Sequence, residues 1–148
     1  MDVASYPMEK VAMDLFDLRG GNFLVMVDRY IGFPWVTRLR STAMTSVCAA
    51  LLDCFITVGF PRLIKSDGGP QFCGPFSDFC TKYNIIHEVL SPYHPASNGL
   101  AEATVKSMKR LLEKLDGRID SDEFKIALLA WRTTPRADGF APAFGFYG

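Results

Sequence analysis

The sequence predicts an α/β domain in which helices flank a mixed sheet of about five strands. Three strand-like segments follow one another near the N-terminus, and helical segments then alternate with two further strand-like segments. Strands joined by short turns pair antiparallel, whereas strands separated by a helix pair in parallel through a crossover. Almost half of the 148 residues are apolar, so the chain can bury one proper core but is too short for two domains.

The first three strands are expected to form an antiparallel meander. Lys10–Leu18 is apolar on both alternating sets of residues, with Asp14 in its middle. This pattern predicts a strand that is buried on both faces. A Gly-Gly turn leads to the second strand at 23–30, and the short connection favours a hairpin. The third strand, 35–39, alternates in polarity and is expected at an edge of the sheet.

The remaining elements alternate helices with strands. Ser41 or Thr42 is expected to cap a helix that runs to Val58 and ends at Gly59. The later elements are expected as a strand, a helix, a strand and two helices at residues 62–66, 75–83, 85–90, 99–115 and 121–133. A loop at 91–98 contains two prolines, and its Ser97 or Asn98 can cap the next helix.

Composition narrows the function classes. Acids and bases balance at 16 each, whereas a dedicated non-specific DNA binder usually carries a basic excess. A nucleic-acid role would therefore depend on a local basic stripe or on neighbouring domains. The four cysteines form no CxxC pair, which predicts buried, reduced thiols in an intracellular protein. The apolar stretch 43–60 contains Asp53 and several hydroxyl residues, which indicates a buried helix and no membrane span.

Three carboxylates stand in settings that suggest a metal site. Asp14 interrupts an apolar strand, and a buried carboxylate needs a partner or a metal. Asp67 ends a strand, where ligands bind in α/β folds, although Asp-Gly is also an ordinary turn signal. Glu102 lies in the first turn of a helix, where the helix dipole alone favours an acid. If the three converge, their oxygens suit two Mg²⁺ or Mn²⁺ ions in phosphoryl transfer.

The helix that carries Glu102 also carries a basic face. Lys106 and Lys109 lie four and seven residues beyond Glu102 and share its side of the helix. A lysine stripe is commonly only a solvated face, but beside a metal ligand it would contact a phosphodiester. Tyr93 in the preceding loop can stack on a DNA end, or it can belong to a plain surface loop.

These segments resemble the catalytic core of retroviral and retrotransposon integrases, above all those of Ty3/gypsy-type elements. The likeness rests on MDLF at 13–16, SDGGPQF at 66–72 and SPYHPASNGLAE at 91–102, with a further match at 127–135. It runs over nearly the whole chain. The resemblance implies a ribonuclease H-like fold and one integrase catalytic core domain over 1–148. The family's N-terminal zinc module and C-terminal DNA- or chromatin-binding region would lie outside it.

The resemblance also implies an Asp-Asp-Glu site that holds two Mg²⁺ or Mn²⁺ ions when DNA is bound. The metal ligands and catalytic residues would be Asp14, Asp67 and Glu102. Family enzymes trim the 3′ ends of element DNA with water and then join the new 3′ hydroxyls to target DNA. The positions that match DNA contacts in the family are Tyr93, Asn98, Lys106 and Lys109.

The expected partners are the DNA ends of the element and target DNA. A homodimer or higher oligomer is also expected, through the apolar helix at 43–60 or the helix that carries Trp131. We expect no membrane partner and no small-molecule cofactor beyond the metal. The expected place of action is intracellular, in the nucleus at the time of integration.

Several positions depart from the family pattern. The spacing between Asp67 and Glu102 is one residue shorter than usual, and Ala96 and Ala103 stand where Gln and Arg are usual. Asn84 replaces a usual Gly, and Asn tolerates the left-handed backbone that Gly would adopt. These departures leave open a non-catalytic integrase-derived module that binds DNA or protein. A ribonuclease H-type nuclease is a further alternative, although the motif around the third acid favours an integrase.

Overall fold

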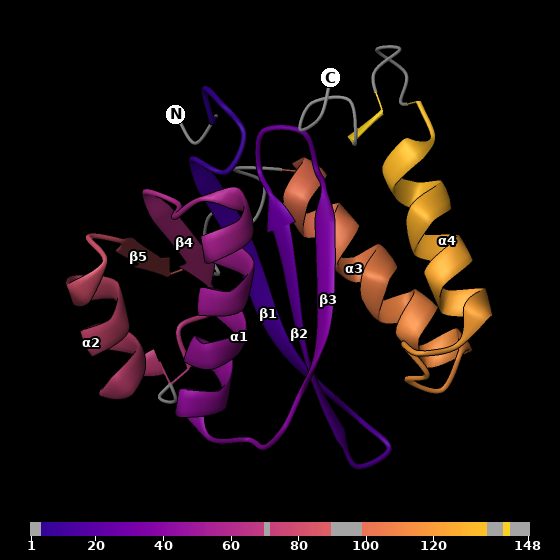
Figure 1. Cartoon of the computed structure of the whole chain (residues 1–148), viewed down its shortest axis with the longest axis horizontal. Helices are drawn as coiled ribbons and strands as arrows, with labels where there is room; N and C mark the ends of the chain where they lie inside the picture. Colours follow the sequence, from indigo (N-terminus) through magenta and orange to yellow (C-terminus); the bar gives the residue numbers. More distant parts are fainter. Residues whose placement is uncertain (1–3, 70–71, 90–98, 136–140, 143–148) are drawn as a thin grey trace.

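The elements of the computed structural model, which describes residues 4–69, 72–89, 99–135 and 141–142, follow the predicted order (Figure 1). The strands are β1 (Lys10–Leu18), β2 (Gly21–Asp28), β3 (Pro34–Leu39), β4 (Leu63–Ser66) and β5 (Ile86–Val89). The helices are α1 (Met44–Val58), α2 (Pro75–Lys82), α3 (Gly99–Lys114) and α4 (Asp122–Thr133).

The five strands form one mixed sheet in the order β3-β2-β1-β4-β5. β2 pairs antiparallel with both β1 and β3, while β4 pairs in parallel with both β1 and β5. The predicted fold class is therefore confirmed: a three-strand antiparallel meander plus two parallel strands, flanked by helices. β1, which carries Asp14, is the central strand, and β3 lies at an edge as expected.

Helices cover both faces of the sheet (Figure 1). α1 and α2 bury one face, and α3 buries the other, with α4 beyond it. Neighbouring residues of β1 alternate between the two cores, since Met13 packs on the α1 side and Ala12 on the α3 side. Phe55 and Met108 are among the largest fully buried side chains of the two cores, and each such side chain stabilises the fold by about 1.5–3 kcal/mol.

The predicted cap of α1 is wrong. The N-cap is Ala43, which makes no side-chain hydrogen bond to the helix. Ser41 Oγ accepts a hydrogen bond from the Ala43 N–H at 3.2 Å and pairs with Ser46 Oγ at 2.9 Å. The Ser41 hydroxyl therefore stabilises the turn that leads into α1, and Thr42 does not begin the helix either.

β2 begins and ends two residues earlier than the expected 23–30, but several other element ends agree with the residue types. Gly59 follows α1 with a φ of 101°, and its N–H donates to the Phe55 carbonyl. Ser121 caps α4 by accepting a hydrogen bond from the Phe124 N–H at 3.2 Å. Asn84 has a φ of 56°, which is the left-handed backbone expected where it replaces a glycine.

The four cysteines are free thiols, but the expectation that all are buried is wrong. Cys80 is buried, Cys48 and Cys54 are partly buried, and Cys73 is exposed. Burial raises the pKa of the Cys54 and Cys80 thiols to about 11, so both remain protonated at neutral pH. Among the described helices, none combines the length and apolarity that a bilayer crossing requires.

Candidate functional site

Asp14 lies in the middle of the central strand, on the face that α3 covers. Its Cα pairs with Val25 of β2. Ala12 and Phe16, two residues to either side, pack into the core under α3, and side chains two apart on a strand share a face. A quarter of the Asp14 side chain, 25%, remains exposed, so the carboxylate is sheltered but reachable.

The partner of Asp14 is a lysine from α3. The Lys109 ammonium forms an ion pair with Asp14 Oδ2. The same ammonium lies 5.4 Å from the centre of the Phe16 ring, close enough for a cation–π contact. The sequence predicted that Asp14 needs a partner, and the lysine face of α3 supplies one.

Asp67 follows β4 directly and is exposed. Lys10 pairs with Leu63, and Ala12 with Lys65, in the parallel ladder of β1 and β4. Continued by two residues, this register brings Asp67 level with Asp14 on the neighbouring strand. Adjacent strands lie about 4.8 Å apart, so a continued ladder would place these two acids on neighbouring segments of the sheet.

Glu102 lies in the first turn of α3. Both of its carboxylate oxygens are buried, and neither has a hydrogen-bond partner in the described part of the chain. A buried carboxylate without a partner is costly, and such groups usually bind a cation. Read from sequence alone, Glu102 has an ordinary explanation, since helix dipoles favour acids at this position.

The donor chemistry of these acids fits a hard divalent cation, because Mg²⁺ and Mn²⁺ prefer carboxylate oxygens. The partnerless oxygens of Glu102 are the observation that best fits such an ion. However, across the described residues no three His, Cys, Asp or Glu side chains are grouped so that they could hold a metal. Asp14 pairs with Lys109 instead. The ligand set of Asp14, Asp67 and Glu102 therefore stays a prediction.

A family comparison decides what kind of domain this is. Residues 4–95 match the model of the integrase core domain. The chain belongs to this family. The matched range contains Asp14 and Asp67 and ends before Glu102. The predicted membership of the integrase cores is confirmed, while the Ty3/gypsy branch stays a prediction.

Curated relatives of this integrase core are much longer than the chain. The Gag-Pro-Pol polyprotein of squirrel monkey retrovirus is 36% identical over 92 residues, which cover 62% of this chain and 5% of the polyprotein. An uncharacterized protein of Caenorhabditis elegans is 30% identical over 152 aligned residues, covering 99% of this chain and 12% of that protein. The chain thus spans a small part of the relatives that it matches.

Solved integrase structures share the fold. The catalytic core of BIV integrase superposes with a TM-score of 0.74 at 19% identity, covering 95% of this chain and 94% of that one. The HTLV-2 integrase catalytic core, in complex with magnesium and in a dimeric form, gives 0.72 at 22% identity, covering 98% and 99%. An intasome of simian T-cell lymphotropic virus gives 0.79 at 23% identity, covering 100% of this chain and 57% of that chain.

The predicted DNA contacts of this integrase core divide into two groups. Tyr93 and Asn98 lie outside the described residues. Lys106 is exposed on α3, one turn before Lys109. Lys109 is engaged with Asp14, so the two lysines share a helix face but differ in their surroundings.

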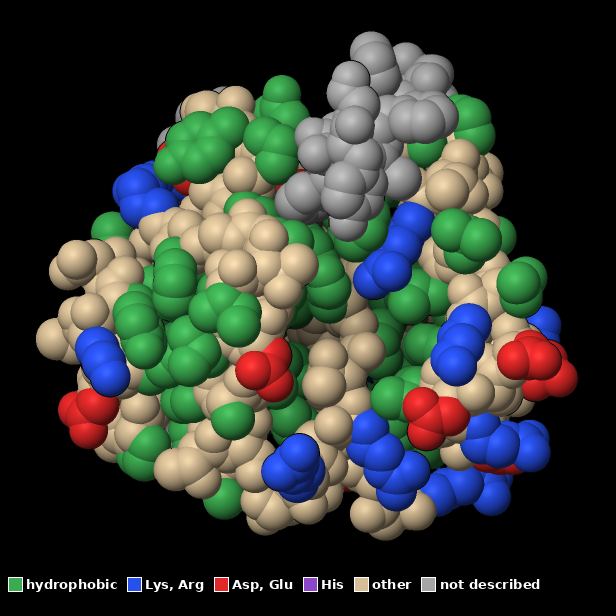
Figure 2. Space-filling view, in the orientation of Figure 1, with side chains coloured by type: hydrophobic (Ala, Val, Ile, Leu, Met, Phe, Trp, Pro, Cys, Tyr) green, Lys and Arg blue, Asp and Glu red, His purple; other side chains and the backbone are tan. Residues whose placement is uncertain are grey.

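Sequence reasoning missed a second basic region of the integrase core. Lys and Arg side chains gather over the lower end of the molecule in Figure 2, where Figure 1 shows the β1–β2 turn and the connection of α3 to α4. Arg19 and Arg118 flank Asp116 at 3.1 and 3.7 Å. Arg38 lies 5.8 Å above the ring of Phe23. The arginines come from segments far apart in sequence, so no local charge run indicated them.

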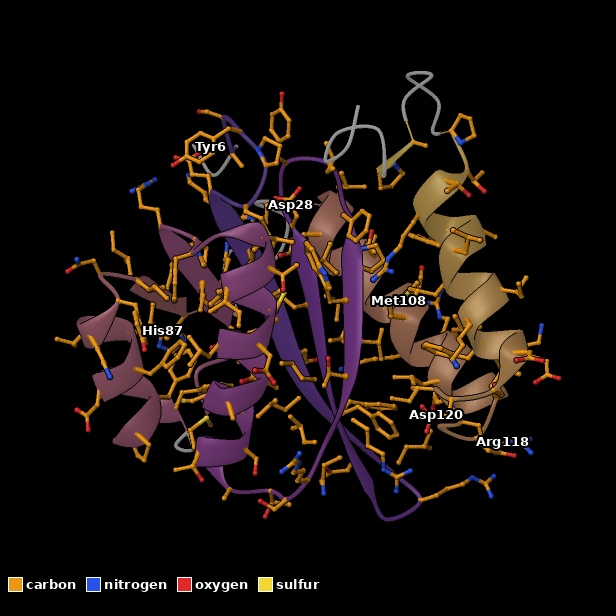
Figure 3. All side chains as sticks on the ribbon, viewed as in Figure 1. Tyr6, Asp28, His87, Met108, Arg118 and Asp120 are labelled. Carbon is orange, nitrogen blue, oxygen red and sulfur yellow. The ribbon has the colours of Figure 1, made fainter. Side chains whose placement is uncertain are left out.

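Sequence reasoning also missed a histidine behind the Asp67 turn. His87 lies on β5 beside α2 (Figure 3), and its Nε2 is 2.6 Å from Ser66 Oγ. Burial lowers the pKa of His87 below its ordinary value of 6.5, because a partly buried imidazole loses hydration when it becomes charged. Nothing local marks this pair, since the two residues are 21 positions apart.

The lowered pKa of His87 makes a stability prediction. The unfolded chain takes up a proton near the ordinary pKa of 6.5, before the folded protein does. The free energy of unfolding is therefore expected to be undiminished above that pH and to fall as the pH drops toward the folded pKa. Urea unfolding at pH values between about 5 and 8, where histidine titrates, measures the slope of the unfolding free energy against pH. In His87→Gln the slope is expected to decrease, and an unchanged slope would contradict the assignment.

Proposed function

We propose that this domain is a metal-dependent polynucleotidyl transferase that processes the 3′ ends of retroelement DNA and joins them to target DNA. The observation that carries the proposal is the buried carboxylate of Glu102, whose oxygens have no partner among the described residues. If the β1–β4 register continues two residues past its last pair, Ala12 with Lys65, it brings Asp14 level with Asp67. α3 covers the sheet face of Asp14 and carries Glu102.

Asp14, Asp67 and Glu102 would hold Mg²⁺ or Mn²⁺, with two ions when DNA is bound. Two such ions activate the attacking oxygen and stabilise the leaving oxygen of a phosphodiester. The protein's own part would be to hold the three carboxylates at this site, two on the neighbouring β1 and β4 segments and one on the packed helix α3. Water would be the nucleophile in end processing, and a 3′ hydroxyl in strand transfer.

Lys109 would have one role before the metal binds and another after it binds. Its ammonium neutralises Asp14 when no metal is present. An ammonium and a metal ion would compete for the same carboxylate oxygen, so the Lys109 side chain would have to leave Asp14 for that acid to hold the metal. Lysine is a flexible point charge, and from α3 it would then contact a substrate phosphate together with the exposed Lys106.

Beyond the metal site, DNA would be contacted by residues of the preceding loop and by basic side chains. Tyr93 and Asn98 are proposed to hold the element end. The second basic region, with Arg19, Arg38 and Arg118, supplies the local positive charge that the balanced composition requires. We also propose that the domain works as a homodimer or higher oligomer in the nucleus.

The test is reversal of strand transfer by the domain on a branched DNA that mimics the joined product. With Mn²⁺, the wild type is expected to release the element end and reseal the target strand. Asp67→Asn keeps the side-chain shape but loses the charge, and it is the control. Product formation no higher than that of Asp67→Asn would overturn the catalytic proposal.

A second candidate is a non-catalytic module derived from an integrase. It is favoured by the absence, in the described part of the chain, of three side chains grouped to hold a metal, and by Ala103 beside Glu102. Calorimetric titration with Mn²⁺ separates the two. Binding by the wild type that each acid-to-amide variant weakens supports the enzyme, and DNA binding without metal binding supports the module. Cleavage of an RNA–DNA hybrid without strand-transfer reversal would instead indicate a ribonuclease H-type nuclease.

A further inference from the structure

Ser66 connects the Asp67 turn to the neighbouring strand. It is fully buried at the end of β4, immediately before Asp67. Its Oγ accepts a hydrogen bond from the Gly68 N–H at 3.4 Å and lies 2.6 Å from His87 Nε2 on β5. One hydroxyl thus contacts the backbone on the far side of Asp67 and a side chain of the next strand.

The His87 ring is held in place by aromatic packing. It lies edge-on to Phe76, with ring centres 4.9 Å apart, and 5.6 Å from the ring of Phe72. This apolar setting favours the neutral imidazole, in agreement with the lowered pKa of His87. A neutral ring with its proton on Nδ1 accepts the Ser66 O–H at Nε2. The lone pairs of Ser66 Oγ then remain available to the Gly68 N–H.

β5 also holds the Asp67 turn by direct packing. Gly68 has a φ of 72°, and a Cβ added there would overlap with Cγ1 of Val89. The turn is therefore pressed against the end of β5 with no space for a side chain. Asp67 itself has a weak local restraint, since its Oδ1 accepts the Gly69 N–H at 3.3 Å. The direction of the Asp67 carboxylate depends mainly on how the backbone around it is held.

We propose that His87 is a positioning residue that orients Asp67 through Ser66. Its hydrogen bond holds the Ser66 hydroxyl in place, and this hydroxyl in turn holds the Gly68 N–H. The turn between Ser66 and Gly68 then orients the Asp67 carboxylate toward the metal site. His87 lies behind the turn, against the rings of Phe72 and Phe76, and does not touch the reacting atoms. This inference rests on the proposed function, because it assigns His87 to the metal site that the three acids would form.

Two substitutions separate the hydrogen bond from the ring packing. His87→Phe keeps an aromatic ring against Phe76 but removes the acceptor for Ser66. His87→Gln removes the ring but places an amide near the position of Nε2. If His87 positions Asp67, then His87→Phe is expected to weaken Mn²⁺ binding about tenfold, as loss of a partner behind a metal ligand usually does. His87→Gln is expected to stay within about threefold of the wild type, well under that loss.

Ser66→Ala provides a second route to the same measurement. It removes one oxygen and is expected to weaken Mn²⁺ binding about tenfold, like His87→Phe. The double variant is expected to bind no more weakly than either single one, because both act through one hydrogen bond. Calorimetry on the full chain gives the affinities, and thermal unfolding of each variant shows that it is folded. Should His87→Phe fail to fold, Ser66→Ala with His87→Gln still decides the question.

The outcomes are distinct. Variants that bind Mn²⁺ like the wild type overturn the positioning role and leave the proposed function standing. A His87→Gln variant weaker than His87→Phe shows that ring packing matters and the hydrogen bond does not, which also overturns it. A wild type that binds no Mn²⁺ overturns the proposed function and this inference together.

Discussion

Replacing Glu102 with Gln is expected to abolish Mn²⁺-dependent strand-transfer reversal and to stabilise the metal-free protein. Activity should fall at least about 100-fold, because loss of a ligand exceeds the 10–100-fold cost of losing a residue behind one. The free energy of unfolding should rise by about 1 kcal/mol, since a neutral amide loses less on burial than a carboxylate does. The expected loss of activity and gain of stability follow from one observation: the two buried Glu102 oxygens have no partner in the described residues.

Glu113→Gln is the matched control for this experiment. Glu113 is exposed on the same helix, so its amide variant should change neither activity nor stability appreciably. Urea unfolding without metal gives the stability, and product formation from branched DNA gives the activity. A Glu102→Gln variant less stable than the wild type would mean that the carboxylate has a stabilising partner, and the metal-ligand assignment would lose its main support.

Replacing Lys109 with Ala is expected to tighten Mn²⁺ binding and to weaken activity on DNA. The Lys109 ammonium occupies Asp14 in the metal-free protein, so its removal frees the carboxylate for the metal. A partly exposed ion pair contributes up to about 1 kcal/mol, which corresponds to about a fivefold change in affinity. Strand-transfer reversal at saturating Mn²⁺ should nevertheless fall, because a phosphate contact is lost.

Lys106→Ala separates the two roles. Lys106 lies on the same face of α3 but is exposed, and its variant should leave Mn²⁺ affinity unchanged while reducing DNA binding. Calorimetry measures the first quantity, and the salt dependence of DNA binding measures the second. Equal Mn²⁺ affinities in the wild type and Lys109→Ala would show that the ion pair does not compete with the metal.

Much of the fold could be predicted because it depends on local patterns. The apolar run of β1 and the Gly-Gly turn after it determine the hairpin, and β1 begins and ends where predicted. The start of α1 could not be predicted in the same way. Ser41 is a good capping residue by type, yet its hydroxyl bonds to Ser46 and to the Ala43 N–H, because the chain approaches α1 from β3 through a turn that only the tertiary structure defines.

In the candidate site, too, local sequence patterns predicted some features, and others depend on tertiary contacts. The need of Asp14 for a partner followed from its apolar strand, whereas Lys109 was expected only on the helix face of Glu102, and its pairing with Asp14 was not predicted. The burial of the Glu102 oxygens depends on what covers α3, which no local pattern indicates. The pair of Ser66 and His87 depends on the register of β4 with β5. Contacts of this kind appear only when strands distant in sequence are aligned.

The parallel pairing of β1 with β4 has a consequence for how such domains tolerate change during evolution. Asp14 and Asp67 belong to neighbouring segments that the parallel pairing of Lys10–Ala12 with Leu63–Lys65 holds together, and Glu102 is carried by a helix packed on the sheet. Distance along the chain therefore does not set the distance between the carboxylates. Insertions or deletions between the second and third acid, such as the one-residue deficit of this sequence, can accumulate without displacing the acids, provided that the sheet and α3 keep their packing.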